Sequence, residues 1–488
     1  MQRKYFLSIP LALTLATSLL QAEANVPKQA LKTNGQLIYQ KQKTAQSFTQ
    51  MFQDGQFYGR LRTNNFYFWY KQESTNKNKQ LIGAVGGSFV YRSALYNGFD
   101  LTAGLYGSQS FFNENQLDTI SAIKPGKDTL SRFEYVNTGS KSLYAFGQAN
   151  IGYTYSKTKL TLGRQLVETF YTKSNDTKMI PNSFDGAVLA TKDIPNTNIK
   201  FAYLTKQKLR DHTDAHAVFM VGDANSSTSV NPQWSENDDS AMHKGLTYTA
   251  LKAAGKPTDA PLIVLDAQNS SIKNLKINFS SYLVPKLLSQ IMTEVNYKIP
   301  FKGFSITPGL RYIQQFDNGA GAVGGASIYQ TGLEGYKDKN SLDSGMIAAR
   351  LVAKVDDYKI SLAYTGVLNK ADLVTPWRGF PTAGYTRSMG MYNWRANVKS
   401  YRLELVYGSN AKGIYTKPFI QTSILYMDGD ANKNETDSML YYAGIVQNIP
   451  SMQNLQYRVR LGWRDFIGSN ALNISDYLDS RFEINYLF

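Results

Sequence analysis

The chain ends in Arg-Phe-Glu-Ile-Asn-Tyr-Leu-Phe (residues 481–488), in which polar and apolar side chains alternate and the last residue is aromatic. One face of this segment carries Phe482, Ile484, Tyr486 and Phe488, and the other carries Arg481, Glu483 and Asn485. A period of two indicates a β-strand with one apolar and one polar side. Because the pattern returns along most of the chain, it predicts an all-β protein whose strands each have two unlike faces.

The composition narrows the kind of β protein. Of the 488 residues, 42% are hydrophobic and 13% are aromatic, yet the mean hydropathy is −0.35. After the first twenty residues, no run approaches the roughly 18 to 20 apolar positions that a membrane helix needs, which excludes a helical membrane protein. Only helices and closed barrels satisfy every backbone polar group in lipid, so a chain of this kind that spans a membrane must do so as a barrel. A water-filled barrel explains the polar average beside many Tyr and Phe residues.

The N-terminus indicates the compartment. Arg3 and Lys4 precede an almost uncharged apolar stretch that ends near Leu20, and the small residues Ala22 and Ala24 offer a cleavage site, as in a Sec signal peptide. We expect residues 1–22 to be a signal peptide, with cleavage after Ala22 or Ala24. The alternative, a short membrane anchor, is disfavoured because a polar segment follows. We interpret residues 23–56 as a polar periplasmic lead-in and residues 57–488 as the barrel.

The barrel region divides into eighteen candidate strands, each long enough to cross a membrane at the usual tilt. They centre on 57–70, 81–92, 99–112, 143–155, 158–166, 185–192, 199–207, 261–268, 272–283, 289–299, 303–314, 343–355, 357–367, 395–408, 414–427, 438–447, 452–464 and 478–488. Tight turns such as 156–157 and 356–357 alternate with long connections, of which 208–260 is the longest. Short periplasmic turns opposite long extracellular loops are typical of transmembrane antiparallel β-barrels in the outer membrane of Gram-negative bacteria, where we expect this protein.

The alternation also predicts which side chains point inward. A Lys or Arg on the lipid face near the membrane midplane costs about 2 to 4 kcal/mol, so charged residues of a spanning strand should face the lumen. By this rule, a basic ladder of Arg350, Lys354, Arg402, Arg458, Arg460, Arg464 and Arg481 lines the pore, and Lys399 and Glu404 also point inward.

Such a ladder favours transport of anions. Stacked guanidinium groups in a narrow lumen offer successive bidentate sites for carboxylates. Alternatively, these arginines only pair with acidic residues such as Glu404 and Glu483 and stiffen the wall. The net charge of +16 does not indicate nucleic-acid binding, because the charges lie on alternating strand positions and no RNA or DNA motif accompanies them.

Several stretches resemble the OprD-like outer-membrane porin family. Gly163-Arg164-Gln165 and Asn-Asp-Thr-Lys-Met-Ile-Pro-Asn-Ser-Phe-Asp-Gly (residues 175–186) are similar to the family's third extracellular loop, with its order of Asp, basic residue, Pro and Phe-acidic-Gly. Residues 204–211 resemble the strand that follows, and Tyr385 to Met389 with Trp394-Arg395-Ala396 resemble the seventh loop and its return. The likeness covers most of the chain from about residue 52.

This resemblance implies an eighteen-stranded barrel in which the third and seventh loops, 168–186 and 370–394, fold inward and form a constriction. Carried over by position, the constriction residues are Asp176, Lys178, Ser183 and Asp185 in one loop and Tyr385, Arg387 and Ser388 in the other. For each, a role in loop packing is the alternative. The long extracellular loop 208–260 departs from the family pattern. Substrates in the family are small carboxylates and amino acids.

An enzyme is not expected. No Gly-x-Ser-x-Gly motif occurs, and no phosphate loop, dinucleotide fingerprint or cysteine pair is present, so we expect no cofactor. Asp211, His212 and His216 could hold a metal ion, but we favour a solvated outer loop and predict no metal site.

The sequence therefore predicts a porin for passive diffusion of small anionic or zwitterionic solutes. An outer-membrane adhesin or structural barrel with little conductance is the alternative. Expected partners are outer-membrane lipid and lipopolysaccharide, and the barrel-assembly machinery, which would recognise Phe488. A monomer and a trimer are both compatible with the sequence.

Overall fold

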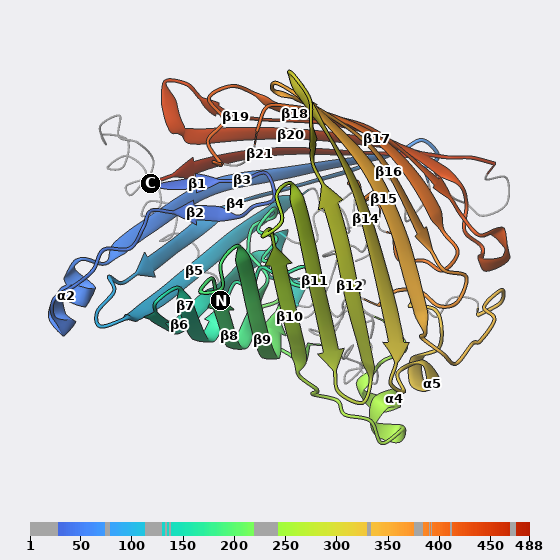
Figure 1. Ribbon diagram of the computed structural model, residues 1–488, viewed down its shortest axis with the longest axis horizontal. Coiled ribbons are helices and arrows are strands. Elements are labelled where there is room, and N and C mark those ends of the chain that lie inside the picture. Colours follow the sequence, from blue (N-terminus) through green and yellow to red (C-terminus); the bar gives the residue numbers. More distant parts are fainter. Residues whose placement is uncertain are drawn as a thin grey trace, which may run out of the picture.

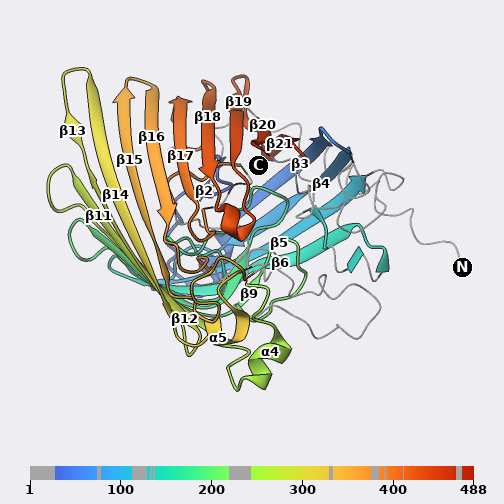
Figure 2. The same ribbon diagram turned by 90° about the vertical axis from the view of Figure 1, so that its right-hand side faces the viewer.

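In the computed structural model, strands that follow one another in the chain pair antiparallel, and the last strand, β21 (Tyr477–Leu487), pairs with the first long strand, β3 (Gln56–Tyr70), which closes the sheet into a barrel (Figures 1 and 2). The structure describes residues 28–73, 79–112, 129–131, 134–135, 138–218, 243–328, 333–374, 384–389, 391, 393–409, 412–468 and 475–488. The expected signal peptide and its cleavage sites lie outside these residues. Closure gives every strand two partners, which removes the open edges that lipid would not tolerate.

The barrel has eighteen long strands, and the two-residue β13 (Ile299–Pro300) pairs beside the start of β14. The first nine long strands are β3 (Gln56–Tyr70), β4 (Gln80–Arg92), β5 (Phe99–Phe112), β6 (Ser142–Tyr155), β7 (Thr158–Gln165), β8 (Ser183–Thr191), β9 (Thr197–Lys208), β10 (Leu262–Asn269) and β11 (Leu275–Val284). The others are β12 (Leu288–Tyr297), β14 (Phe304–Asp317), β15 (Ser344–Val355), β16 (Tyr358–Val367), β17 (Lys399–Tyr407), β18 (Phe419–Asp428), β19 (Ser438–Ile449), β20 (Met452–Phe466) and β21 (Tyr477–Leu487).

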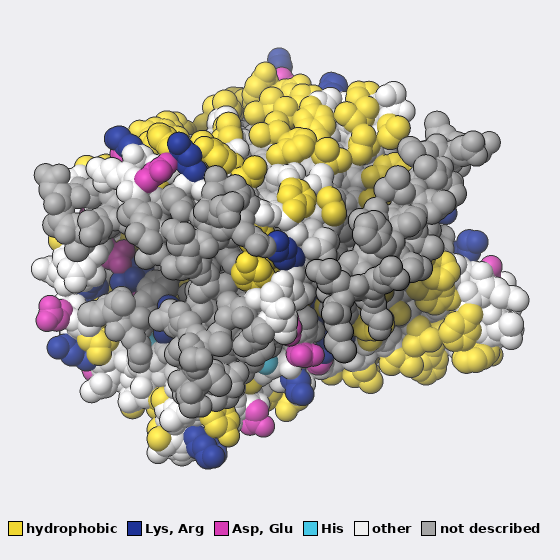
Figure 3. Space-filling model, turned by 180° about the vertical axis from the view of Figure 1, so that it is seen from behind, with side chains coloured by type: hydrophobic (Ala, Val, Ile, Leu, Met, Phe, Trp, Pro, Cys, Tyr) yellow, Lys and Arg dark blue, Asp and Glu magenta, His cyan; other side chains and the backbone are white. Residues whose placement is uncertain are grey.

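Side chains alternate between the two faces of each strand. On β3, Leu61 is 45% exposed, while its neighbours Arg60 and Arg62 are buried, and on β14, Leu310 is 58% exposed. Large apolar side chains left open on the outer face would be unfavourable in water, whereas they are matched to lipid. Figure 3 shows hydrophobic side chains gathered in broad patches over the outside of the molecule.

The predicted strands are all present, and most boundaries agree within a few residues. β17 begins at Lys399 and not at residue 395, because Asn397 has a left-handed backbone with φ of 63°, which a strand does not accommodate. β18 begins at Phe419 and not at residue 414, directly after Pro418, which has no N–H to donate to the sheet.

The connections alternate in length as expected. At the periplasmic end, two residues join β6 to β7 and β15 to β16, and Ser156 and Asp356 have the positive φ that such tight hairpins need. At the extracellular end, the long connections include 166–182, 209–261 and 368–398, which we call L3, L4 and L7. Two connections depart from the pattern: 285–287 is short at the extracellular end, and 408–418 is long at the periplasmic end.

The closing seam involves the last residue of the chain. Gly59 N–H donates to the carbonyl of Phe488 at 2.8 Å, and Phe488 N–H donates to the carbonyl of Gly59 at 3.0 Å. The Phe488 ring covers Gly59 so closely that a Cβ atom there would lie 2.1 Å from it. A glycine at position 59 therefore lets the terminal aromatic ring lie flat over the seam.

Small elements lie at the two ends of the barrel. The helices α2 (Phe48–Gln53), α4 (Tyr248–Ala253) and α5 (Gly321–Gly324) and the 3-10 helix η4 (Ala431–Lys433) are each a turn or two long. No helix in the described ranges has the length and apolar character needed to cross a membrane. A separate two-stranded sheet, β1 (Gln29–Leu31) with β2 (Leu37–Tyr39), belongs to the segment that we interpret from sequence as a periplasmic lead-in.

Candidate functional site

Arginines from three adjacent strands converge on the inner face of the barrel wall, below L3. They lie on β3, β20 and β21, which are neighbours because the barrel closes between β21 and β3. The pairing sets Arg460 opposite Arg481 and Arg458 opposite Glu483. We call this group the L3 cluster; it comprises Arg60, Arg62, Arg458, Arg460, Arg481, Asp176, Asp479 and Glu483.

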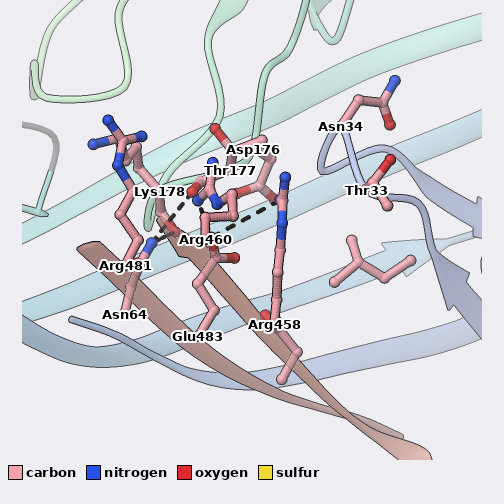
Figure 4. Close-up of polar contacts among 12 residues, drawn as sticks. Thr33, Asn34, Asn64, Asp176, Thr177, Lys178, Arg458, Arg460, Arg481 and Glu483 are labelled. Atoms are coloured by element: carbon pink, nitrogen blue, oxygen red, sulfur yellow. Dashed lines mark hydrogen bonds and ion pairs between the residues drawn. The ribbon is translucent and has the colours of Figure 1, made fainter. Parts of the chain in front are cut away.

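Asp176 connects L3 to the wall. Its carboxylate accepts from Arg60 Nη1 at 2.8 Å and from Arg62 Nη1 at 2.6 Å (Figure 4 shows Asp176 among the cluster). All three side chains are at most 4% exposed. One carboxylate thus joins two buried guanidinium groups, an arrangement that is costly to disrupt because either partner alone would be an unpaired buried charge.

Further contacts hold the tip of L3 in place. Asn64 on β3 donates to the carbonyl groups of Thr177 and Lys178, each at 3.2 Å (Figure 4). Lys178 Nζ lies 4.0 Å from the centre of the Phe66 ring, which is a cation–π contact. Met179 and Ile180 are fully buried against the wall of β3 to β6. Both polar and apolar contacts therefore fix L3 inside the barrel.

The remaining cluster carboxylates belong to the wall itself. Arg460 Nη2 donates to Glu483, and Arg458 lies 3.8 Å from the same carboxylate. Arg481 makes a two-pronged contact with Asp479, at 2.8 and 2.5 Å. In this cluster, five arginines face three carboxylates.

A second group of charges lies on the inner face of β12 and β14 to β17. Arg311 Nε donates to Glu294 at 2.6 Å, and Arg350 donates to Asn296 at 2.6 Å. Arg402 lies 3.3 Å from Glu404 and also donates to the carbonyl of Arg387. We call this group the L7 cluster; it comprises Glu294, Arg311, Arg350, Arg402, Glu404 and Tyr385.

Tyr385 ties L7 to these arginines. The guanidinium carbons of Arg311 and Arg350 each lie 4.3 Å from the centre of its ring. Phe170 of L3 also lies under Arg311, with 4.9 Å between guanidinium and ring centre. Burial raises the pKa of Tyr385, so its phenol stays neutral. Side chains from both L3 and L7 therefore meet at one arginine of the wall.

Several guanidinium N–H groups have no protein partner in the described residues. They are buried and comprise Nε and Nη2 of Arg62 and Nε of Arg350, Arg402, Arg460 and Arg464. Buried N–H donors are normally paired, so such groups call for an explanation, of which water or a bound anion is the usual one.

The other sequence-predicted residues lie outside these clusters or at their edge. Arg464 is 4.2 Å from the Phe466 ring centre and donates to Ser438 at 3.3 Å. Lys354 is exposed, and Ser183 is buried at the start of β8. Ser388 forms an isolated bridge with Met391.

Two expected positions are contradicted. Asp185 lies in β8 and not in a loop, and its carboxylate forms an ion pair with Arg164 at 2.7 Å. Arg164 is on the same face of β7 as the exposed Leu160 and Leu162, so this ion pair lies on the outside of the barrel. Lys399 does not point inward, because it is an even number of residues from the exposed Tyr401; it lies 3.7 Å from Asp428.

Sequence reasoning missed Arg60, Arg62 and Arg311. The signal was available, because Arg60 and Arg62 flank the outward Leu61 in the same way that Arg458 and Arg460 flank Val459. Arg311 likewise lies between Leu310 and Tyr312, both of which are exposed on the outer face.

The histidines of L4 are buried and not solvated, contrary to our interpretation of that loop. His212 and His216 are 4% and 7% exposed, and Nδ1 of the first lies 2.8 Å from Nε2 of the second. Asp211 Oδ1 is 4.0 Å from the ring of His212. Over the described ranges, no group of three or more His, Cys, Asp or Glu side chains is arranged to hold a metal ion.

Comparisons with known proteins agree with this architecture. The family model for outer membrane porins of the OprD family matches residues 126–254, a range that contains L3. No curated protein sequence matches the chain. Among solved structures, Pseudomonas aeruginosa OccK9 (OpdG) is similar with a TM-score of 0.67 and 15% sequence identity, over 90% of this chain and 99% of that one.

Two further structures from Pseudomonas aeruginosa have the same coverage of 90% and 99%. OccK8 (OprE) has a TM-score of 0.64 with 14% identity. OpdK, whose crystal structure is with vanillate, has a TM-score of 0.63 with 12% identity. At such identities, the likeness to these structures establishes the fold.

Proposed function

We propose that the chain is an OprD-like outer-membrane porin and that it lets small anionic or zwitterionic solutes, such as carboxylates and amino acids, diffuse passively through a basic-lined lumen. The observation that carries this proposal is the L3 cluster, in which arginines outnumber carboxylates beside an inward-folded loop. The ion pairs with carboxylates use only part of the hydrogen-bonding capacity of these arginines, since Nε and Nη2 of Arg62 and Nε of Arg460 have no partner in the described residues.

The two clusters together would offer a carboxylate a series of binding sites along the lumen. Each guanidinium offers charge-assisted hydrogen bonds, and the carboxylates nearby limit how tightly any one site binds. Conduction needs sites that attract a solute but release it again, and partial neutralisation provides this balance. A zwitterion would enter with its carboxylate toward the arginines and its amino group toward Glu483 or Glu404.

The vanillate bound by OpdK supports this choice of solute, because vanillate is a small aromatic carboxylate. Tyr385 and Phe170, stacked on Arg311, would present apolar surface next to a guanidinium. A solute with both a carboxylate and a flat apolar part matches that surface.

The expected partners follow from the same proposal. The exposed aromatic and aliphatic belt would contact outer-membrane lipid and lipopolysaccharide. Phe488, the end of the closing strand, would be recognised by the barrel-assembly machinery. Monomer and trimer are both compatible with the outer face.

The proposal is tested by swelling of liposomes that contain the purified protein. We expect faster uptake of small carboxylates than of neutral sugars of equal size. The double variant Arg458→Ala and Arg460→Ala should lose most of this preference. A matched control, Lys298→Ala with Lys302→Ala, removes two charges from the exposed periplasmic turn and should change nothing. Equal uptake of both solute classes by the unaltered protein would overturn the proposal, and so would a double variant that keeps its preference.

A further inference from the structure

The N-terminal hairpin (residues 28–40) packs inside the periplasmic mouth of the barrel. Gln29, Ala30 and Leu31 are at most 7% exposed, although the segment is polar and short. The side chain of Gln29 donates to the carbonyl of Gly59 at 2.6 Å, next to the closing seam. Figure 1 shows β1 beside the end of β21, in agreement with this contact.

The hairpin also contacts the connection between β17 and β18 and the inner face of β20. Leu31 N–H donates to the carbonyl of Gly413 at 3.1 Å, and Thr33 N–H donates to the hydroxyl of Tyr415 at 3.1 Å. Gln456, an inward residue of β20, donates to the carbonyl of Leu31 at 3.1 Å. The long periplasmic connection 408–418 therefore has a definite role, since it supplies two of these contacts.

The base of the hairpin is tied to the rim. Ala45 N–H donates to the carbonyl of Leu95 at 2.7 Å, and Leu95 N–H donates to Lys43 at 2.8 Å. Tyr39 lies against Tyr58, with 4.6 Å between ring centres, and burial raises the pKa of Tyr39 to about 12. Fixed at its base and along the arc of the wall from β4 to β18, the hairpin cannot swing away without losing many contacts.

The tip of the hairpin touches the tip of L3. Gly35 has a left-handed backbone with φ of 84°, and a Cβ atom there would lie 2.4 Å from the carbonyl carbon of Asp176. Figure 4 shows the neighbouring Thr33 and Asn34 beside Asp176 and Arg458. Only a glycine fits at position 35, because a side chain would collide with the backbone of Asp176 and because the positive φ disfavours other residues.

We propose that the N-terminal hairpin is a lumenal support that holds the tip of L3 from the periplasmic side and narrows the exit of the channel. Asp176 is then held from two directions, by Arg60 and Arg62 of the wall and by the backbone of the hairpin. This inference requires that the barrel conducts, but it does not depend on which solute passes.

The absence of cysteine from the chain makes a single-thiol test clean. Asn34→Cys places a thiol at the exposed hairpin tip, and 2-(trimethylammonio)ethyl methanethiosulfonate is added to a single channel in a planar bilayer. We expect a stepwise loss of current. The control Ser271→Cys puts the thiol on an exposed periplasmic turn, where labelling should leave the current unchanged. A current that stays constant when Asn34→Cys is labelled would overturn the proposal.

A pair of glycine variants tests the contact with L3. Gly35→Val and Gly303→Val impose the same backbone strain, with φ of 84° and 85°, but only the first meets Asp176, since nothing lies within 4 Å of a Cβ atom on Gly303. We expect altered conductance and a noisier open state for Gly35→Val alone. Identical records from the two variants would refute the support of L3. Reversal potentials from the same records report ion preference separately, so the solute proposal can fail without affecting this one.

Discussion

Replacement of Asp176 by Asn should release the tip of L3 and make the channel more selective for anions. The substitution keeps the shape of the side chain but removes the charge that pairs with Arg60 at 2.8 Å and Arg62 at 2.6 Å. It also leaves two buried guanidinium groups without their common counter-charge.

The size of the effect follows from burial. The three side chains are 1% to 4% exposed, and loss of one partner from a buried ion pair costs about 3 to 5 kcal/mol. Asparagine keeps one acceptor oxygen, so we take the lower end, roughly 3 kcal/mol, which changes the ratio of docked to released L3 by about a hundredfold. The barrel itself should remain folded, because Asp176 takes no part in the pairing of its strands.

Single-channel recording measures both consequences. For Asp176→Asn, we expect frequent current fluctuations and a reversal potential shifted toward that of chloride. The matched control is Asp185→Asn, since that ion pair with Arg164 is about a quarter exposed and lies on the other face of the sheet. Steady, unshifted currents for Asp176→Asn would refute the reasoning, as would an equal change in the control.

Two other perturbations test the loops. Tyr385→Leu removes the ring between Arg311 and Arg350 and should weaken the docking of L7 by about 1 to 2 kcal/mol, which would appear as a noisier single-channel current. Tyr385→Phe keeps the ring and should behave as the unaltered protein. Equal current noise in the two variants would contradict the stacking of Tyr385 on the arginines. His243 of L4 is buried, and its Nε2 lies 2.8 Å from the carbonyl oxygen of Gly325, where L4 docks on the neighbouring connection. Burial lowers the pKa of His243 to about 4 from its usual 6.5, so docked L4 binds a proton only at a lower pH than released L4 does. Docking is therefore fully stable above pH 6.5 and weakens by roughly 3 kcal/mol as the pH falls to 4. A spin label on Lys244→Cys should become more mobile over this range, and a further His243→Gln change should abolish the pH dependence; equal pH dependence with and without His243 would contradict this assignment.

The wall of the barrel was largely predictable because strand alternation is a local property. Once Val459 is placed toward lipid, Arg458 and Arg460 must point inward, whatever the rest of the chain does. The prediction that Lys399 points inward was wrong only because Lys399 was assigned to the face opposite Tyr401, whereas the two residues share one face. It would have found Arg60 and Arg62 had it been applied to the first strand.

The interior could not be predicted in this way. The two partners of Asp176, Arg60 and Arg62, lie more than a hundred residues away in sequence. Which wall residues Asp176 meets depends on how L3 folds back into the barrel. The hairpin is a still clearer case. β1 and β2 have three residues each, too few for a periodic signal, and Leu31 is bound by Gln456 from the other end of the chain. Such contacts follow from closure of the barrel, which brings the two ends of the chain together.

The central claim, that excess arginine inside the barrel selects anions, is tested most directly by the reversal potential of the unaltered channel in a potassium chloride gradient. Screening by salt weakens such selectivity, so the measurement belongs at low ionic strength. We expect a reversal potential near the chloride equilibrium potential, which moves toward zero when Arg458 and Arg460 are replaced by Ala. A reversal potential at zero or near that of potassium would contradict it.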